Sequence, residues 1–142
     1  MKKLFTILFA FACLQANAAE EKNIRISTDN TDLILQVGEN GRLYQTYIGK
    51  KLLHEQDLQN FQWDVHAGSD GSVSKRGWEV YGGSGYEDFF EPAIAITHHD
   101  GNPATVLHYV SSSTHTVEGG TETIIQLRDK QYPVEVNLHY VA

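Results

Sequence analysis

Short runs of alternating apolar and polar residues, separated by clusters of turn residues, recur along most of this chain. The alternation is clear in residues 23–28, 31–37, 42–48 and 134–140. Successive side chains of a β-strand point to opposite faces, so each run can bury one face while the other meets water. Several short strands of this kind, with turn signals between them, predict an all-β fold, either an antiparallel sandwich or a barrel.

The link between two of these runs is the clearest local signal. Residues 38–41, Gly-Glu-Asn-Gly, join the pattern of residues 31–37 to that of residues 42–48. The Asn-Gly pair supplies the positive-φ positions that a tight hairpin requires. The sequence therefore predicts a β-hairpin here.

Two segments interrupt the strand pattern. Residues 49–61 are the only candidate for a helix, but they lack a convincing cap, so we expect a loop with a short helical turn. Residues 66–77 are polar and rich in glycine, which predicts a long surface loop. We therefore expect little or no helix after the first 18 residues.

The second half of the chain continues the strand pattern. Residues 92–97, 106–117 and 121–128 carry it, although residues 106–117 could form one long strand or two, and Ile124 breaks the alternation of the third run. The final pattern runs almost to Ala142. A complete domain can end in this way, and so can a chain truncated at a domain border.

The first 18 residues have the parts of a bacterial export signal in order. Two lysines at residues 2–3 precede an apolar stretch at residues 4–14, and Ala-Asn-Ala at residues 16–18 matches a small-residue cleavage site. The apolar stretch is too short to span a bilayer. We expect a Sec-type signal peptide at residues 1–18, one domain at residues 19–142, and a periplasmic or secreted protein.

Two other interpretations of this N-terminal segment are less favoured. A buried N-terminal helix does not explain why the parts of an export signal stand in the right order. A lipoprotein signal would use Cys13, but Phe11 stands where a small residue is needed and Ala10 where Leu is usual.

Loss of the signal peptide would leave 124 of the 142 residues, which suits one domain with a modest core. Cys13 is the only cysteine, so the mature chain would have no disulfide, no thiol chemistry and no cysteine-based metal site. Without Lys2 and Lys3 the formal charge changes from −7 to −9. Such an acidic chain is a poor partner for nucleic acid, and no basic amphipathic stretch indicates a membrane surface.

The spacing of the histidines gives no metal-binding signal. They are His54, His66, His98, His99, His108, His115 and His139. Two histidines at i and i+2 on a strand would share a face, but the sequence contains no His-x-His. A metal site would need assembly from distant segments, and the sequence has no nucleophile elbow, phosphate loop or dinucleotide fingerprint. We therefore expect neither a metal nor a cofactor.

Carboxylates are the remaining candidates for chemistry. Glycoside hydrolysis needs two of them on opposite sides of a sugar, roughly 5 Å or 6.5–9.5 Å apart. The candidates by residue type are Asp64, Asp70, Glu79, Glu87, Asp88 and Glu91. Most are expected to be exposed acids that keep the chain soluble. Glu87 and Asp88 are adjacent and would point apart on an extended segment, so they cannot easily flank one bond.

The segment Tyr-Gly-Gly-Ser-Gly-Tyr-Glu-Asp-Phe-Phe-Glu-Pro-Ala-Ile, residues 81–94, differs from the rest of the chain. Its glycines permit close approach of the backbone and unusual dihedral angles. Aromatic side chains beside acceptor groups suit a sugar, which has apolar C–H faces and hydroxyl donors. The alternative is that Phe89 and Phe90 pack under the loop as part of the core.

Several blocks of the sequence together match a known family pattern. They are residues 26–47, residues 81–85 with Asp-Phe-Phe-Glu-Pro-Ala at 88–93, Leu-His-Tyr-Val-Ser at 107–111, and Tyr-Pro-Val-Glu-Val-Asn-Leu-His-Tyr at 132–140. In order and spacing they resemble the N-terminal domain of the α-galactosidases of glycoside hydrolase family 36, over essentially the whole mature chain. The glycine-rich block departs from the family, because Tyr86 and Glu87 intervene after Gly85 and Phe90 stands where Arg is usual.

The resemblance implies a β-sandwich of the supersandwich type that precedes a (β/α)₈ barrel. In the family, two catalytic aspartates lie at the C-terminal face of that barrel, so none of the residues of this chain would be catalytic. Asp88 lies in the matching loop block and is the one residue expected to contact substrate. The chain would be the non-catalytic N-terminal domain of an exported, retaining α-galactosidase. It would support the barrel, contribute to oligomer contacts, and reach the rim of the α-galactoside site.

Two alternatives from other classes remain. One is a free-standing carbohydrate-binding β-sandwich that works without a barrel. The other is a small independent hydrolase that uses Glu87 or Asp88, which their adjacent placement disfavours. If the chain belongs to a larger enzyme, we expect the isolated domain to expose an apolar patch that the barrel would cover, and to associate readily.

Overall fold

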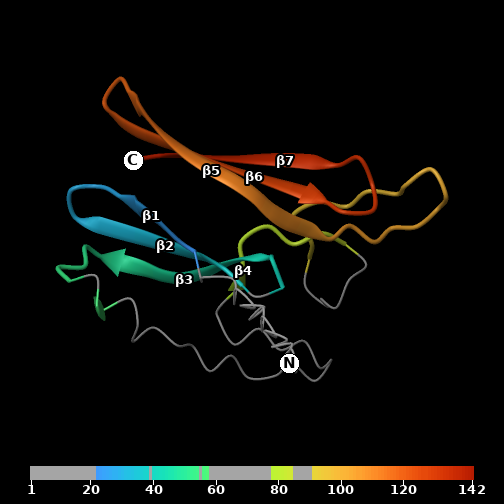
Figure 1. The fold of residues 1–142 in the computed structure, drawn as a ribbon, viewed down its shortest axis with the longest axis horizontal. Coiled ribbons are helices and arrows are strands. Elements are labelled where there is room, and N and C mark those ends of the chain that lie inside the picture. The colour runs from blue at the N-terminus through green and yellow to red at the C-terminus, as the bar shows by residue number, and fades with distance from the viewer. Residues whose placement is uncertain (1–21, 39, 55, 58–77, 85–90) are drawn as a thin grey trace, which may run out of the picture.

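The computed structural model describes residues 22–38, 40–54, 56–57, 78–84 and 91–142, which form two antiparallel sheets (Figure 1). The strands are β1 (Asn23–Ser27), β2 (Thr31–Val37), β3 (Leu43–Lys50), β4 (Trp78–Glu79), β5 (Leu107–Val117), β6 (Gly120–Asp129) and β7 (Glu135–Val141). The first sheet has the order β1-β2-β3-β4, and the second has the order β5-β6-β7. No α-helix occurs in the described ranges, and the expected all-β sandwich is confirmed.

The first sheet is a meander in which each strand pairs with the next one in the chain. The predicted hairpin joins β2 to β3, and Gly41 in its turn has a φ of 79°. The Gly41 N–H donates to the Gly38 carbonyl at 2.8 Å, and the Gly38 N–H donates to the Arg42 carbonyl at 2.9 Å. Glycine at position 41 fits because other residues rarely adopt this φ.

The second sheet is built on one long hairpin. β5 runs through its 11 residues without a break, so the pattern of residues 106–117 forms a single strand. A register shift between Tyr109 and Ser111 makes a bulge in β5 while it stays paired with β6. The turn after β5 has two residues, and the second, Gly119, has a φ of 84°. This is the geometry that a two-residue hairpin turn demands.

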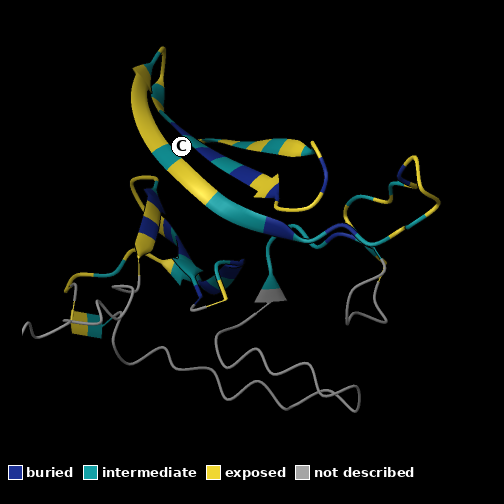
Figure 2. Ribbon diagram, turned by 45° about the vertical axis from the view of Figure 1, so that its right-hand side comes forward, coloured by how far each residue is buried: buried dark blue, intermediate teal, exposed yellow. Residues whose placement is uncertain are grey.

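Apolar side chains from both sheets pack together and form the core. Figure 2 shows buried residues, in dark blue, on strands of both sheets. The buried members of this core are Ile24, Ile26, Leu35, Leu43, Leu107, Ile125 and Leu127. Val134, Val136, Leu138 and Tyr140 of the C-terminal segment pack against them, partly buried. The alternation of the sequence predicted this shared face, because residues two apart on a strand point the same way.

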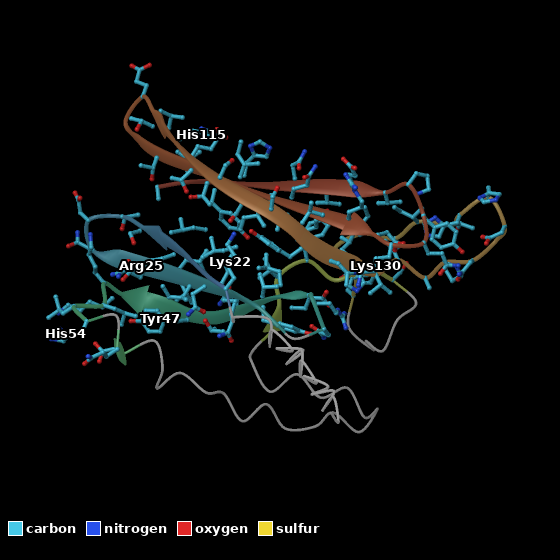
Figure 3. The ribbon with its side chains drawn as sticks, in the orientation of Figure 1. Lys22, Arg25, Tyr47, His54, His115 and Lys130 are labelled. Atoms are coloured by element: carbon cyan, nitrogen blue, oxygen red, sulfur yellow. The ribbon has the colours of Figure 1, made fainter. Side chains whose placement is uncertain are left out.

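On the opposite face of the first sheet, β2 is also buried, whereas Asn23 and Arg25 of β1 are exposed. Ile34 on β2 is 1% exposed, and its neighbour Asp32 is 0% exposed. The Arg25 guanidinium on β1, labelled in Figure 3, donates to the Asp32 carboxylate at 2.6 Å. The Ser27 hydroxyl and the Leu52 N–H donate to the same carboxylate at 2.6 Å and 2.7 Å. These donors compensate the cost of burying a charge.

The opposite face of the second sheet is open to water. Along β5 it presents Ser111, Ser113 and His115, all exposed. Arg128 on β6 and Glu135 on β7 form an ion pair at 2.5 Å, with about half of each side chain exposed. The second sheet therefore shows the apolar-in, polar-out pattern of a sheet that is covered on one side.

Among the remaining sequence expectations, the strand at residues 92–97 is wrong and the short helical turn within residues 49–61 is confirmed. Residues 92–97 do not form a strand; among them only Ile94 makes an isolated bridge, to Gly83. In the described part of residues 49–61, the Asp57 N–H donates to the His54 carbonyl at 3.1 Å, which closes one turn without an α-helix. The long loop expected at residues 66–77 lies outside the described residues, as does the signal peptide expected at residues 1–18.

Candidate functional site

The loop of residues 81–94 carries the predicted sugar contact. Asp88 lies outside the described residues, together with Glu87, Phe89 and Phe90, so its role stays a prediction. The structure does describe both ends of the loop, residues 81–84 and 91–94. These two ends show how the loop is attached to the sandwich.

Backbone hydrogen bonds hold the two ends of the loop together. The Ala93 N–H donates to the Gly82 carbonyl at 2.9 Å, and the Ser84 N–H donates to the Ile94 carbonyl at 3.1 Å. Between these bonds, Gly83 and Ile94 form a parallel bridge. The loop is thus closed at its base, where the chain leaves and re-enters the sandwich.

A third segment closes over the same point. The Thr105 N–H donates to the Ser84 carbonyl at 3.0 Å, and the Ser84 hydroxyl donates to the Pro103 carbonyl at 2.8 Å. A Cβ on Gly83 would lie 1.9 Å from the Thr105 carbonyl oxygen, so this close approach of two backbones requires glycine. We call residues 82–84, 93–94 and 103–105 the loop base.

A stacked pair of rings connects the loop base to the second sheet. The His98 and Tyr132 rings have their centroids 3.5 Å apart and are inclined by 6°. His98 Nε2 lies 3.0 Å from the Ala104 carbonyl and 3.1 Å from the Thr105 hydroxyl. Tyr132 follows β6, so the loop base rests on the connection between β6 and β7.

Asp100 is one of two carboxylates beside this ring pair. Its oxygens accept from the Asn102 N–H at 3.0 Å and from the Tyr132 hydroxyl at 2.9 Å. These two hydrogen bonds lower the pKa of Asp100, because they favour its charged form. Asp100 is therefore ionised at neutral pH and holds the loop of residues 98–104 against Tyr132.

Asp129, at the end of β6, is the second carboxylate. It accepts from the backbone N–H groups of Val106, Gln131 and Tyr132 at 2.6 Å, 2.7 Å and 2.9 Å. Burial by itself would raise the pKa of Asp129, but these three bonds outweigh it and lower the pKa. An acid that is already ionised cannot serve as a general acid at neutral pH, so Asp129 has a structural role.

The other candidate acids are dispersed. Glu79 on β4 forms an ion pair with Arg42, and both side chains are mostly buried. Glu91 is exposed at the end of the loop, and Asp64 and Asp70 lie outside the described residues. Within the described ranges no three His, Cys, Asp or Glu side chains come together as a metal site would require. In the same ranges, no helix has the length and apolar character to cross a membrane.

The loop base can position a binding loop. It fixes both ends of that loop through backbone contacts, and it is anchored in turn by His98, Tyr132 and Asp129. This support was not predicted from the sequence. The turn residues at 98–103 predicted only a turn. Nothing in the sequence indicated that Tyr132, more than thirty residues further along the chain, would stack on His98.

The fold and the loop base define a class of protein: an antiparallel β-sandwich domain that carries a firmly held glycine-rich loop. The sequence model of the glycosyl hydrolase family 36 N-terminal domain matches residues 41–142. The chain belongs to this family.

Several solved structures that share this fold are α-galactosidases or a galactosidase domain. An α-galactosidase from Lactobacillus brevis superposes with a TM-score of 0.66 and 21% identity, covering 88% of this chain. The family 36 α-galactosidase AgaA from Geobacillus stearothermophilus gives 0.66 and 20% identity over 85% of this chain. The galactosidase domain of the α-galactosidase-sucrose kinase AgaSK gives 0.61 and 24% identity over 82% of this chain.

The match covers only a small part of each of these proteins. The chain spans 20% of the Lactobacillus and Geobacillus structures and 19% of the AgaSK structure. At these identities the likeness concerns the fold. Among curated proteins, no match to this chain was found.

Proposed function

We propose that this chain is the non-catalytic N-terminal β-sandwich domain of a bacterial α-galactosidase that is exported to the periplasm or secreted. The complete enzyme would hydrolyse terminal α-galactosides with a (β/α)₈ barrel, and this domain would support that barrel and the enzyme's oligomer. The observation that carries the proposal is the family match over residues 41–142, together with solved α-galactosidases of which this fold is one fifth.

The loop base supports a part in shaping the substrate site. A loop held by backbone hydrogen bonds at both ends can present a side chain at a fixed place, which recognition of a sugar hydroxyl requires. In this proposal Asp88 lies at the rim of the galactoside site and accepts a hydrogen bond from the sugar. The Geobacillus enzyme has been solved with raffinose and with stachyose, and such α-galactosides are the substrates to test.

The decisive experiment begins with the gene. We expect the reading frame to continue past codon 142 into a barrel, and we expect the longer product to hydrolyse an aryl α-galactoside while the 142-residue chain does not. Turnover by the 142-residue chain that is lost in Asp88→Asn would overturn the non-catalytic role. A genuine stop codon followed by an unrelated gene would count against the whole proposal.

The role of Asp88 has its own test in the longer enzyme. Asp88→Asn should raise KM for raffinose about tenfold or more, because a hydrogen bond to a charged acceptor contributes about 1.5–3 kcal/mol, and should change kcat little. Glu91→Gln is the matched control, because Glu91 is an exposed acid of the same loop. An unchanged KM in Asp88→Asn, or an equal rise in both variants, would remove Asp88 from the site.

Export can be tested separately. N-terminal sequencing of protein from the periplasm or medium should begin at Ala19. Protein that stays in the cytoplasm with an intact N-terminus would contradict the signal peptide.

The alternative of a free-standing carbohydrate-binding module has its own test. In calorimetric titration of the 142-residue chain with galactose and raffinose, heat of binding would support that alternative.

A further inference from the structure

Two turns of this chain share one construction, and each contains a glycine with a positive φ. Gly41, between β2 and β3, has a φ of 79°, and Gly101, in the segment before β5, has a φ of 84°. The residue before the glycine is Asn40 in the first turn and Asp100 in the second. In such pairs the backbone nitrogen of the glycine can attack the side-chain carbonyl carbon of the residue before it. Glycine favours this reaction because it has no side chain to obstruct the attack.

The main-chain hydrogen bonds of the two turns correspond to each other. In the first turn the Gly38 N–H donates to the Arg42 carbonyl at 2.9 Å, and the Gly41 N–H donates to the Gly38 carbonyl at 2.8 Å. The turn of residues 98–102 has the same two bonds, both at 2.9 Å. In both turns, therefore, the glycine nitrogen that would have to attack is bonded to a carbonyl of its own turn.

A tyrosine hydroxyl holds the side chain before each glycine. Asn40 Oδ1 accepts from the Arg42 N–H at 3.0 Å, and Asn40 Nδ2 donates to the Tyr44 hydroxyl at 2.7 Å. We call these two bonds the Tyr44 clamp. The Asp100 carboxylate is held in the same way, by the N–H two residues further along the chain and by the Tyr132 hydroxyl.

The second sheet holds the glycine of the first turn in place as well. The Gly41 carbonyl accepts from the Tyr109 N–H at 2.8 Å. A Cβ on Gly41 would lie 3.3 Å from Cδ2 of His108, so the imidazole ring lies close against this glycine. All of these groups belong to the chain itself, so the clamp does not depend on what lies against the domain from outside.

The two side chains differ in how readily they react. Attack on an ionised carboxylate is unfavourable, and Asp100 is ionised because hydrogen bonds from the Asn102 N–H and the Tyr132 hydroxyl lower its pKa. The carboxamide of Asn40 is neutral and can release ammonia. Asn40 and Gly41 also form the only Asn-Gly pair of the sequence. Of the two turns, the first is therefore the one that can react at neutral pH.

We propose that Asn40 is a latent site of spontaneous deamidation, and that the Tyr44 clamp keeps it unreactive while the turn is closed. In the reaction the Gly41 nitrogen bonds to Cγ of Asn40 and gives up its proton. The bond from Cγ to Nδ2 breaks, and ammonia leaves with that proton. Water then opens the cyclic imide and yields aspartate or isoaspartate. The proposal concerns this turn alone and is independent of the galactosidase proposal.

The two products should affect the sandwich differently. Aspartate at position 40 can still accept hydrogen bonds from the Arg42 N–H and the Tyr44 hydroxyl, as the carboxylate of the other turn does. Isoaspartate adds one carbon to the main chain just before Gly41, and this displaces the Gly41 carbonyl from the Tyr109 N–H. Isoaspartate therefore weakens a contact that joins the two sheets.

Peptide mapping by mass spectrometry measures the reaction in the purified protein during incubation at mildly alkaline pH. Folded wild type should deamidate at Asn40 at least about fivefold more slowly than the same protein unfolded in urea, because the closed turn adds the two bonds of the clamp. Tyr44→Phe keeps the ring but loses the hydroxyl, and it should react about two- to tenfold faster than wild type. Asn40→Asp gives the reference mass of the product.

Tyr132→Phe is the matched control, because it removes the corresponding hydroxyl from the other turn. Its rate at Asn40 should equal that of wild type. Urea unfolding of each variant gives its unfolded fraction, which accounts for reaction through global unfolding. Equal acceleration in both variants would overturn the proposal, as would a Tyr44→Phe protein that reacts no faster than wild type. A folded wild type that reacts as fast as the unfolded protein would show that the turn gives no protection, and would also overturn it.

Discussion

The two sheets of this sandwich share one core but treat their outer faces differently. In the first sheet the outer face is buried along β2, where it holds an ionised Asp32 between Arg25, Ser27 and the Leu52 N–H. In the second sheet the outer face carries exposed polar residues and a half-exposed ion pair, Arg128 with Glu135. The comparison shows that a similar alternation of apolar and polar residues can occur in a sheet that is covered on one face and in a sheet that is covered on both.

The largest expected effect is on the buried carboxylate of the first sheet. Asp32→Ala removes the acceptor of the Ser27 hydroxyl and the Leu52 N–H, and the carboxylate partner of Arg25, so we expect a loss of about 3–4 kcal/mol in the free energy of unfolding. Urea unfolding followed by circular dichroism measures it. A loss below about 1 kcal/mol would mean that the first sheet tolerates an open outer face as the second does.

The next effect compares apolar residues on the two outer faces. Ile34→Ala should cost about 3 kcal/mol, because Ile34 is 1% exposed and its removal leaves a cavity. Ile124 on β6 is the counterpart on the outer face of the second sheet and is only partly buried. Ile124→Ala should cost about 1 kcal/mol. Equal losses of unfolding free energy in the two variants would show that the outer faces of the two sheets are equally buried at these positions.

Acid should weaken the first sheet through Asp32. Burial by itself would raise the pKa of Asp32, but hydrogen bonds from Arg25, Ser27 and the Leu52 N–H, with the Arg25 charge, lower it to about 2 from 3.8. A lowered folded-state pKa gives stability that is present above pH ~4 and is lost as the pH falls toward 2. The contribution is up to about 2 kcal/mol.

Urea unfolding between pH 6 and pH 2 measures this contribution. Asp32→Asn is the reference protein, because it removes the titrating group while keeping the shape of the side chain. The difference in the free energy of unfolding between wild type and Asp32→Asn should shrink as the pH falls below 4. A constant difference across that range would show that Asp32 does not titrate in this way.

The smallest effect is expected at the exposed ion pair of the second sheet. Glu135→Gln removes the partner of Arg128, but both side chains are about half exposed, so we expect a change within about 0.5 kcal/mol. Added salt should change wild type and variant by nearly the same amount. A loss above about 1 kcal/mol would show that this face is covered in solution.

Alternation predicted β1, β2, β3, β5, β6 and β7 and the inner faces of both sheets, but it did not predict β4. Ile24, Ile26, Ile125 and Leu127 lie in the core as the period of two requires. The Gly-Glu-Asn-Gly turn was also predictable, because its chemistry is local. These features depend on residues that are close together in the sequence, so they can be predicted without knowledge of the tertiary structure.

The outer face of the first sheet could not be predicted in the same way. In the run of residues 31–37, Asp32 alternates with apolar residues, which is the usual pattern of a solvent-facing position. Its burial depends on Arg25, from another strand, and on the Leu52 N–H, twenty residues further along the chain. These partners come from tertiary contacts, which cannot be predicted from the periodicity of the sequence.

The segment of residues 92–97 was mistaken for a strand for a related reason. Its alternation is real, but its neighbours are the loop base on one side and the turn of residues 98–103 on the other, so Ile94 makes only one bridge. The role of Asp88 stays a prediction, because it rests on a family resemblance in a block that lies outside the described residues.

The closure of the loop at Gly83 and Ile94 has a consequence for how this domain can vary. Because the base is held by backbone bonds, and by a glycine that lets Thr105 approach, residues between the two ends can be added or exchanged without changing the sandwich. Tyr86 and Glu87 already stand where the related pattern has no residues. The loop base is therefore a suitable graft point, where a library of inserted sequences could be displayed on an unchanged scaffold.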